Sequence, residues 1–223
     1  MPNDEPTPFA ATTRPAAVSG LVRDHLGVPG LLYKEDLLDA ATQSHVLAEV
    51  DARPWQGELR RRVQHYGYRY DYKARAVDTS MRLGPLPDFG LEVARLAIDA
   101  GLLPATPDQL IVNEYQPGQG IAAHVDCEPC FLDVILTVSL GWAYEMDYID
   151  RESREVRPAL LPAGSGLTMT GDARYRWLHR IRPRLSDRGV PRGRRVSLTY
   201  RYVNLRGDSA AAANEGDHAG RPS

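Results

Sequence analysis

The hydrophobic positions in the first half of this chain recur at helical spacing in two segments. Residues 33–51 (YKEDLLDAATQSHVLAEVD) form the first, and residues 88–102 (DFGLEVARLAIDAGL) form the second. In the second segment Asp88 is suited to an N-cap position, and the pattern ends near Gly101. We therefore predict two amphipathic helices before residue 103.

Short segments rich in β-branched and aromatic residues are separated by Gly, Pro or Asp, which is typical of strands. They cover residues 61–72, 109–115, 131–140, 165–171, 174–181 and 194–203. The second half of the chain has no helical pattern that could connect parallel strands, so a parallel α/β fold is disfavoured. We predict a mainly β fold, a double-sheet sandwich or barrel backed by the N-terminal helices.

Length and composition are those of one soluble globular domain, with 223 residues, 43% of them hydrophobic and 25% charged. No apolar run approaches the length of a membrane span, and the first twenty residues lack the pattern of a signal peptide. We expect a domain over residues 21–206, with flexible tails at 1–20 and 207–223. Two cysteines provide no disulfide framework, so we expect a reduced, cytoplasmic protein.

The net charge of −2 is unevenly distributed. Residues 174–201 contain ten arginines and a single acid, Asp187, and a second basic cluster covers residues 60–75. Residues 145–155 are acidic instead. The basic segments could offer a local surface to phosphate groups, or they could be solvated arginines with no partner molecule. Charge alone leaves both interpretations open.

The stretch HVDCE, residues 124–128, carries candidate metal ligands. If residues 121–126 form a strand, His124 and Asp126 point to the same face, and Glu128 follows on that face if the strand continues. A third ligand would complete a facial triad that leaves three metal positions open. His179 is our candidate, because a double-sheet barrel would bring its late strand opposite the pair. A hydrogen-bonded histidine without a metal is the alternative.

Cys127 and Cys130 form a C-x-x-C pair, which can bind zinc. The chain has no second cysteine pair, so a zinc site would need His124 and another histidine. We favour the simpler interpretation, two small apolar thiols in a loop.

Arg195 and Arg201 are six residues apart on one expected strand and therefore face the same side. Two arginines that point into a barrel are costly unless they meet anions, and a dicarboxylate would supply both charges. Asn113 and Tyr115 would add an amide and a phenol to the same interior. The alternatives are a solvated pair of arginines, an edge-strand Asn and a core Tyr.

The ordered set of motifs resembles the AlkB family of Fe(II)- and 2-oxoglutarate-dependent dioxygenases. The resemblance covers about residues 28 to 205, includes the flanking PGQGI, and rests on Asn113, Tyr115, His124, Asp126, His179, Arg195 and Arg201. It implies a double-stranded β-helix (jelly-roll) fold with iron bound by His124, Asp126 and His179. It also implies that iron, 2-oxoglutarate and O2 together oxidise a substrate C–H bond, releasing succinate and CO2.

The same resemblance implies roles for the cosubstrate residues. Arg195, with Tyr115, would hold the distal carboxylate of 2-oxoglutarate, and Arg201, with Asn113, would lie by the carboxylate next to the keto group. Family members that act on bases often carry an Asn two residues after the first arginine, where this chain has Ser197.

For the substrate, Glu128 stands where nucleic-acid demethylases of the family carry an acid that contacts the target base. Tyr68 and Tyr70, in GYRY, resemble the family's aromatic lid. We therefore predict a monomer that demethylates N-alkylated bases in DNA or RNA. Alternatives are the same oxidation on modified transfer RNA, a protein or a small metabolite. A protein of another class, with a vestigial site, would bind nucleic acid through the arginines of residues 174–201.

Overall fold

A computed structural model of the chain describes residues 20–57 and 61–205. The expected tails therefore lie outside the described residues, apart from Gly20. The helices are α1 (Ala40–Asp51), α2 (Asp88–Asp99) and α3 (Gly171–Tyr175), with 3-10 turns at His25–Gly27 and Thr79–Met81. The strands are β1 (Leu31–Lys34), β2 (Val63–Tyr66), β3 (Gln109–Tyr115), β4 (Ile121–His124), β5 (Phe131–Gly141), β6 (Tyr144–Asp150), β7 (Val156–Leu161), β8 (Gly166–Met169), β9 (Trp177–Ile181), β10 (Ser186–Asp187), β11 (Val190–Pro191) and β12 (Arg195–Val203).

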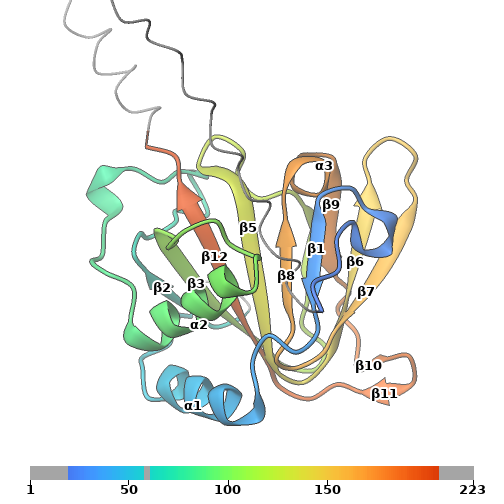
Figure 1. The fold of residues 1–223 in the computed structure, drawn as a ribbon, viewed down its shortest axis with the longest axis horizontal. Coiled ribbons are helices and arrows are strands. Elements are labelled where there is room, and N and C mark those ends of the chain that lie inside the picture. The colour runs from blue at the N-terminus through green and yellow to red at the C-terminus, as the bar shows by residue number, and fades with distance from the viewer. Residues whose placement is uncertain (1–19, 58–60, 206–223) are drawn as a thin grey trace, which may run out of the picture.

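Two antiparallel sheets form the core of the fold (Figure 1). The larger sheet has the order β1-β8-β5-β12-β3-β2, and the smaller has the order β4-β9-β6-β7. Helices α1 and α2 cover the outer face of the larger sheet (Figure 1). The prediction of a mainly β, jelly-roll core backed by N-terminal helices is confirmed.

The side chains of β12 alternate between an apolar face under the helices and a polar face toward the smaller sheet. Val196, Leu198 and Tyr200 are fully buried in the apolar cluster beneath the helices. The intervening residues, Arg195 and Ser197 among them, point to the opposite face, toward the smaller sheet. β12 lies between β5 and β3, so its inward polar side chains occupy the centre of the sheet. The polar side chains on the inner face of β12 are thereby supported by the apolar layer packed against its outer face.

The helix boundaries differ from the prediction for local reasons. Tyr33 and Lys34, the start of the first predicted helix, belong instead to strand β1, which pairs with β8. Helix α1 begins only at Ala40, because the Asp39 side chain accepts a hydrogen bond from the Thr42 amide at 2.8 Å and caps the helix. In the second helix the N-cap is Pro87, and Asp88 is the first helical residue.

Several strand boundaries also differ. Within residues 61–72 only Val63–Tyr66 is a strand, and residues 67–82 form a long excursion that we call the lid. The segment expected at residues 174–181 divides between helix α3 and strand β9. Strand β4 ends at His124, two residues earlier than expected. None of the helices in the described ranges has the length and apolar character needed to cross a bilayer.

Candidate metal centre and cosubstrate pocket

Two neighbouring strands of the smaller sheet bring three possible metal ligands together. His124 on β4 is in register with His179 on β9, and their ring centroids lie 4.3 Å apart. Asp126 follows β4 by two residues, and one ligand atom from each of the three lies within 4.8 Å of the others. The expectation that His179 lies opposite the His124–Asp126 pair is thus met by the structure. Two imidazoles and one carboxylate suit Fe(II) with open coordination positions.

Both histidines have a lone pair for a metal. The His124 Nδ1 atom is 2.8 Å from the carbonyl oxygen of Ala122. In the tautomer that donates this bond, Nε2 keeps its lone pair. Burial, together with the neighbouring His124, lowers the pKa of His179 to about 3, so its imidazole is neutral at physiological pH.

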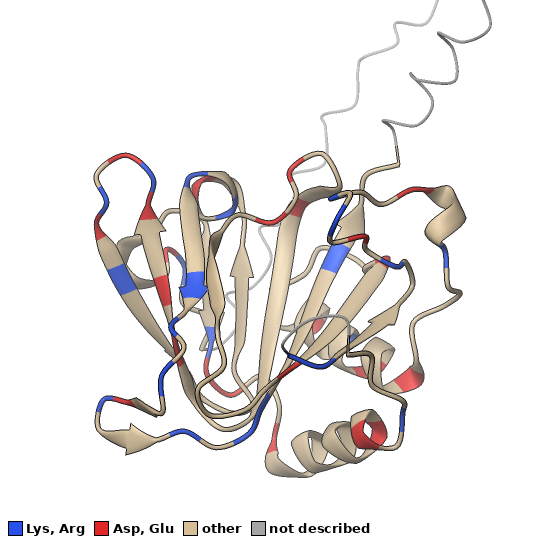
Figure 2. Ribbon diagram, turned by 180° about the vertical axis from the view of Figure 1, so that it is seen from behind, with Lys and Arg blue, Asp and Glu red and all other residues tan. Residues whose placement is uncertain are grey.

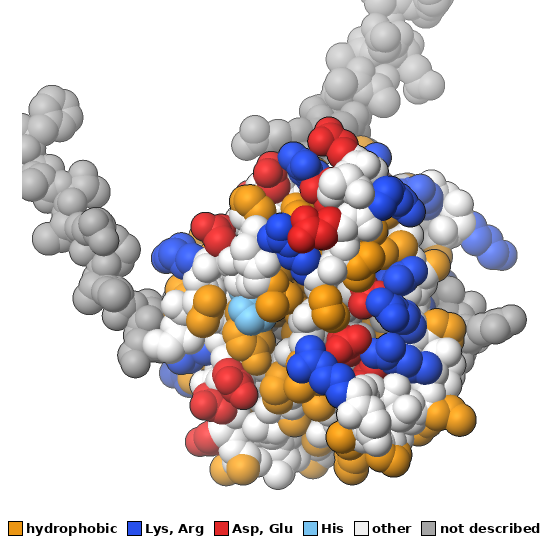
Figure 3. All heavy atoms as spheres, turned by 90° about the vertical axis from the view of Figure 1, so that its right-hand side faces the viewer, with side chains coloured by type: hydrophobic (Ala, Val, Ile, Leu, Met, Phe, Trp, Pro, Cys, Tyr) orange, Lys and Arg blue, Asp and Glu red, His pale blue; other side chains and the backbone are white. Residues whose placement is uncertain are grey.

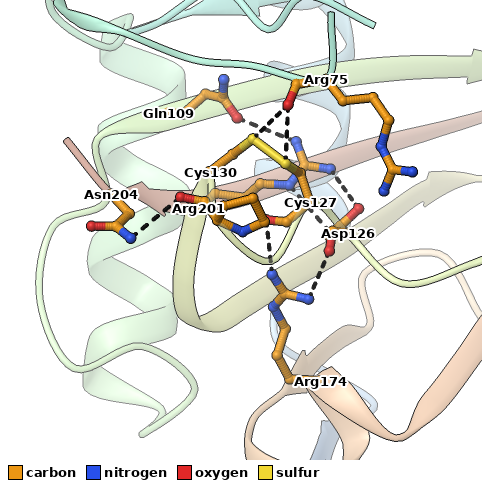
Figure 4. The surroundings of a disulfide bond; sticks show 9 residues. Arg75, Gln109, Asp126, Cys127, Cys130, Arg174, Arg201 and Asn204 are labelled. Carbon is orange, nitrogen blue, oxygen red and sulfur yellow. Dashed lines mark hydrogen bonds and ion pairs between the residues drawn. A yellow bond between two sulfur atoms is a disulfide. The ribbon is translucent and has the colours of Figure 1, made fainter. Parts of the chain in front are cut away.

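The third ligand, Asp126, is buried and ionised. Burial by itself would raise its pKa, but the neighbouring positive charge of Arg201, the largest opposing cause, holds the pKa well below its usual range. Both Arg201 contacts with the carboxylate, from Nε and Nη2, measure 3.2 Å. Arg174 fixes the backbone as well, by donating to the Asp126 carbonyl at 3.0 Å (Figure 4).

A cavity of about 330 Å³ opens between the sheets and is lined by His124, Asp126 and His179. Its floor is Arg195, whose side chain is fully buried. The guanidinium donates to the Ser139 hydroxyl at 2.8 Å and lies 5.5 and 5.9 Å from the ring centroids of Tyr115 and Tyr144. Burial lowers the pKa of Arg195.

Two nitrogens of Arg195, Nε and Nη1, are buried without a hydrogen-bond partner. Leaving charged donors unsatisfied in the interior is costly, so this site is built for an anion that the protein itself does not supply. A carboxylate matches the fork of an arginine. The residues present therefore fit 2-oxoglutarate as well as a metal ion.

The other two expected cosubstrate residues are engaged differently. Asn113 lines the cavity, but its side-chain oxygen accepts from Arg61 Nε at 2.9 Å. Arg201 also lines the cavity and is paired with Asp126 and Gln109. A joint contact of Asn113 and Arg201 with 2-oxoglutarate stays a prediction. Sequence reasoning missed Arg61, for which the basic cluster at residues 60–75 was the available signal.

The lid contributes two tyrosines to the cavity, Tyr70 and Tyr72. Its third tyrosine, Tyr68, packs against the apolar cluster that contains Val77 and Phe131 and is not among the lining residues. The rings of Tyr70 and Tyr72 meet edge to face with centroids 5.0 Å apart. Tyr72 was missed by sequence reasoning, although the alternation at 68, 70 and 72 was a usable signal.

Glu128 does not lie on a continued strand, and this part of the prediction is wrong. Because β4 ends at His124, Glu128 falls in a turn, with its side chain 48% exposed and 3.7 Å from Arg151. It is not among the residues that line the cavity. A contact between Glu128 and a base inside the cavity therefore has no support from this geometry.

The two cysteines, expected to be thiols, are joined as a Cys127–Cys130 disulfide. The C-x-x-C spacing allows this bridge. Both cysteines are buried in an apolar cluster with Val77, Phe131 and Val203. Within the described ranges, the group of possible metal ligands contains neither cysteine. The alternative of a zinc site therefore has no support.

The arginines of residues 174–201 do not form a free basic surface. Eight of the ten make ion pairs with carboxylates, several from the acidic stretch at residues 145–155. Buried Asp147, for example, accepts from both Arg180 and Arg182. Basic and acidic residues accordingly lie side by side on the strands of the smaller sheet (Figure 2) and on the surface in Figure 3. The charges largely neutralise one another.

Comparison with known proteins identifies the class. The model of the 2OG-Fe(II) oxygenase superfamily matches residues 31–201. The chain belongs to this superfamily, and it is a dioxygenase whose cofactors are Fe(II), 2-oxoglutarate and O2.

Individual relatives confirm the AlkB-like resemblance. The chain is 40% identical over 167 residues to tRNA (carboxymethyluridine(34)-5-O)-methyltransferase alkbh8 of Xenopus tropicalis, a match covering 71% of this chain and 26% of that protein. It is 37% identical over 210 residues to the Alkylated DNA repair protein ALKBH8 homolog of Arabidopsis thaliana, with 82% and 61% covered. The chain thus spans less than two thirds of these relatives. The solved structure of OsALKBH1 shares the fold, with a TM-score of 0.61, 19% identity, and 78% of this chain and 97% of that one covered.

Proposed function

We propose that this dioxygenase oxidises a C–H bond on a modified nucleobase, with RNA as the first substrate to test. The observation that carries the proposal is that one cavity is lined by the three metal-ligand candidates, by Arg195 with its two unpaired nitrogens, and by two lid tyrosines. Its volume, about 330 Å³, is at the lower end of small-molecule sites, so a base can enter while the rest of a polynucleotide stays outside.

The roles of the protein's own residues follow from their positions. Arg195 would bind the distal carboxylate of 2-oxoglutarate and set the depth at which the cosubstrate lies. Arg201 keeps Asp126 ionised and oriented beside the two histidines. Iron, when bound with 2-oxoglutarate and O2, supplies the oxidising chemistry. The lid tyrosines would stack on the base and exclude water from the reacting carbon.

The names of the relatives favour nucleic acid as substrate class, and among nucleic acids they favour transfer RNA. One is named for carboxymethyluridine at position 34 of transfer RNA, another for repair of alkylated DNA, and a zebrafish relative, 28% identical, as a probable RNA/DNA demethylase. Oxidation of a modified wobble uridine is therefore our first choice. Demethylation of N-alkylated bases, which would release formaldehyde, is the second.

The class that would bind nucleic acid through the arginines of residues 174–201, without catalysis, is disfavoured. Those arginines are mostly paired with acids, and Arg195 retains an anion site inside the cavity. We also propose that the protein acts in the cytoplasm as a monomer, as the sequence led us to expect.

The test is a substrate screen with mass-spectrometric detection. The purified protein, with Fe(II) and 2-oxoglutarate, is incubated with RNA carrying a 5-carboxymethyl-type wobble uridine and with RNA and DNA carrying N-methylated adenine or cytosine. We expect one of these to gain an oxygen atom or lose a methyl group in step with succinate formation, and Asp126→Ala to abolish the change. Succinate formation stimulated only by a peptide or a small metabolite would contradict the proposal.

A further inference from the structure

The two cysteines of the chain lie in one turn, directly after the metal-ligand candidate Asp126. Cys127 is the next residue, and Cys130 ends the same turn. Both side chains are 5% exposed and pack with Val77 and Phe131 under the lid, residues 67–82. The pair therefore lies between the metal centre and the segment that carries Tyr70 and Tyr72.

Both sulfurs touch the lid at one atom. The carbonyl oxygen of Arg75 is 3.3 Å from the sulfur of Cys127 and 3.1 Å from that of Cys130 (Figure 4). Arg75 belongs to the tip of the lid, which is closed by paired hydrogen bonds between Asp71 and Ala76. Tyr70, on the same arm, lies against Phe131 with ring centroids 5.5 Å apart. Because the two sulfurs are bonded to each other in this structure, both are packing contacts without a hydrogen-bond donor.

The backbone of the turn, by contrast, is fixed by groups that do not depend on sulfur chemistry. Arg174 donates to the carbonyl of Cys127 at 3.2 Å (Figure 4). The backbone N–H of Asn204 donates to the carbonyl of Cys130 at 2.8 Å. A change at the sulfurs therefore acts mainly on the lid and leaves the backbone contacts near Asp126 in place.

We propose that Cys127 and Cys130 form a reversible thiol–disulfide switch that sets how firmly the lid is held over the cavity. A thiol can donate its S–H to the Arg75 carbonyl, whereas a disulfide sulfur has no hydrogen to donate. The oxidised form, which this structure shows, therefore holds the lid tip by packing alone, and reduction adds an S–H···O hydrogen bond that holds it more firmly. The consequence for nucleic-acid substrates rests on the proposed function; the change in lid mobility does not.

The switch needs an oxidant, for which a peroxide is suited. One sulfur attacks a peroxide oxygen, the O–O bond breaks, and the products are a sulfenic acid and water. The second sulfur then attacks the first, the S–O bond breaks, and a second water leaves as the S–S bond forms. Two thiols and one hydrogen peroxide thus give one disulfide and two waters. A small dithiol reverses the change by exchange.

Hydrogen–deuterium exchange of the full chain tests the inference without requiring activity. The protein is prepared after dithiothreitol or after hydrogen peroxide, and the state of its two cysteines is checked by alkylation and intact mass. We expect the amides of residues 71–77 to exchange about two- to threefold faster in the oxidised form, the effect of losing one weak hydrogen bond. Strand β5 serves as the internal reference and should not change.

Two double variants separate the hydrogen-bond donor from the covalent bridge. C127S/C130S keeps donors and should exchange like the reduced protein, with or without peroxide. C127A/C130A has neither donor nor bridge and should exchange like the oxidised protein; if it does not fold, the wild-type comparison still decides. Equal lid exchange in reduced and oxidised wild type, or a pair that peroxide leaves as two thiols, overturns the inference.

Enzyme kinetics provide a second, independent measurement. If nucleic acid is the substrate, oxidation should raise the KM for the oligonucleotide and leave substrate-free 2-oxoglutarate turnover unchanged. Lid exchange that responds to oxidation, in a protein that modifies no oligonucleotide, would support the switch while the proposed function fails.

Discussion

At the scale of single residues, Arg195 has the most sharply defined environment. It is fully buried, it has one hydroxyl partner, and two of its nitrogens lack any. We predict that Arg195→Ala weakens 2-oxoglutarate binding by about 3–5 kcal/mol, because one half of a buried ion pair is removed. Calorimetric titration with 2-oxoglutarate measures this loss directly.

Arg188 offers the matched control for Arg195, since it is also an arginine of the 174–201 segment but its side chain is 56% exposed and pairs with Glu145. Arg188→Ala should leave 2-oxoglutarate binding unchanged. Equal affinity in Arg195→Ala and wild type would remove Arg195 from the cosubstrate site.

Tyr72 is the lid residue for which the structure corrects the sequence reading, because it lines the cavity and Tyr68 does not. We predict that Tyr72→Ala raises the oligonucleotide KM and spares substrate-free turnover, while Tyr72→Phe stays near wild type. The reason is that stacking on a base needs the ring and contributes about 1–3 kcal/mol. Steady-state kinetics with both variants tests this, and a Phe variant as impaired as the Ala variant would argue against stacking.

At the scale of elements, the end of β4 decides the role of Glu128. The strand stops at His124, so the Glu128 carboxylate pairs with Arg151 at the surface. We predict that Glu128→Ala leaves substrate-free turnover unchanged and alters the free energy of unfolding by less than about 1 kcal/mol, as expected for an exposed ion pair. Its effect on oligonucleotide oxidation should be smaller than that of Tyr72→Ala. The reverse order of effects, in parallel assays, would return Glu128 to the substrate site.

Strands with a continuous β-branched pattern could be predicted from the sequence. Strand β3 matches its prediction residue for residue, and β5 and β12 match to within one residue at an end, because their β-branched runs are bounded by turn residues. Register brings His124 opposite His179. His179 could be proposed from the expected barrel and the family resemblance. Alternation predicted that Arg195 and Arg201 share a face of β12, but not that this face is the inner one.

The elements that were not predicted have a physical explanation. Strand β6 contains Glu145, Asp147 and Asp150, whose charges are not typical of a strand in the core of a fold. Arginines from other segments neutralise all three. Strand β1 has only four residues, too few to show a period, and its pairing with β8 identifies it as a strand. Such partners, distant in sequence, are not visible in a local pattern.

At the scale of the whole molecule, paired carboxylates should make stability depend on pH. Burial would raise the pKa of Asp147, but hydrogen bonds from Arg182 and Arg180 outweigh burial and lower it; the Arg62 hydrogen bond lowers the pKa of Glu114. The folded protein therefore binds fewer protons than the unfolded chain, whose carboxyls titrate near about pH 4. The contribution of these carboxylates to stability should be fully present above about pH 5 and be lost below it.

Thermal unfolding followed by circular dichroism tests this pH dependence. We predict that Asp147→Asn lowers the free energy of unfolding at pH 7 by about 1.5–3 kcal/mol, the range for hydrogen bonds to charged groups, and flattens the decline on acidification. Glu152→Gln, at a side chain that is 80% exposed, is the control and should behave like wild type. A decline just as steep in Asp147→Asn would assign the acid sensitivity to other groups.

The central claim is that His124, Asp126 and His179 form the iron site of a 2-oxoglutarate dioxygenase. Its most direct test is Fe(II)-dependent conversion of 2-oxoglutarate to succinate without added substrate, measured for wild type and for alanine variants of the three residues. His65→Ala is the control, since His65 is buried on β2 outside the triad. We predict turnover in wild type and His65→Ala, and none in the three folded triad variants. Full turnover in His179→Ala together with loss in His65→Ala would contradict the account.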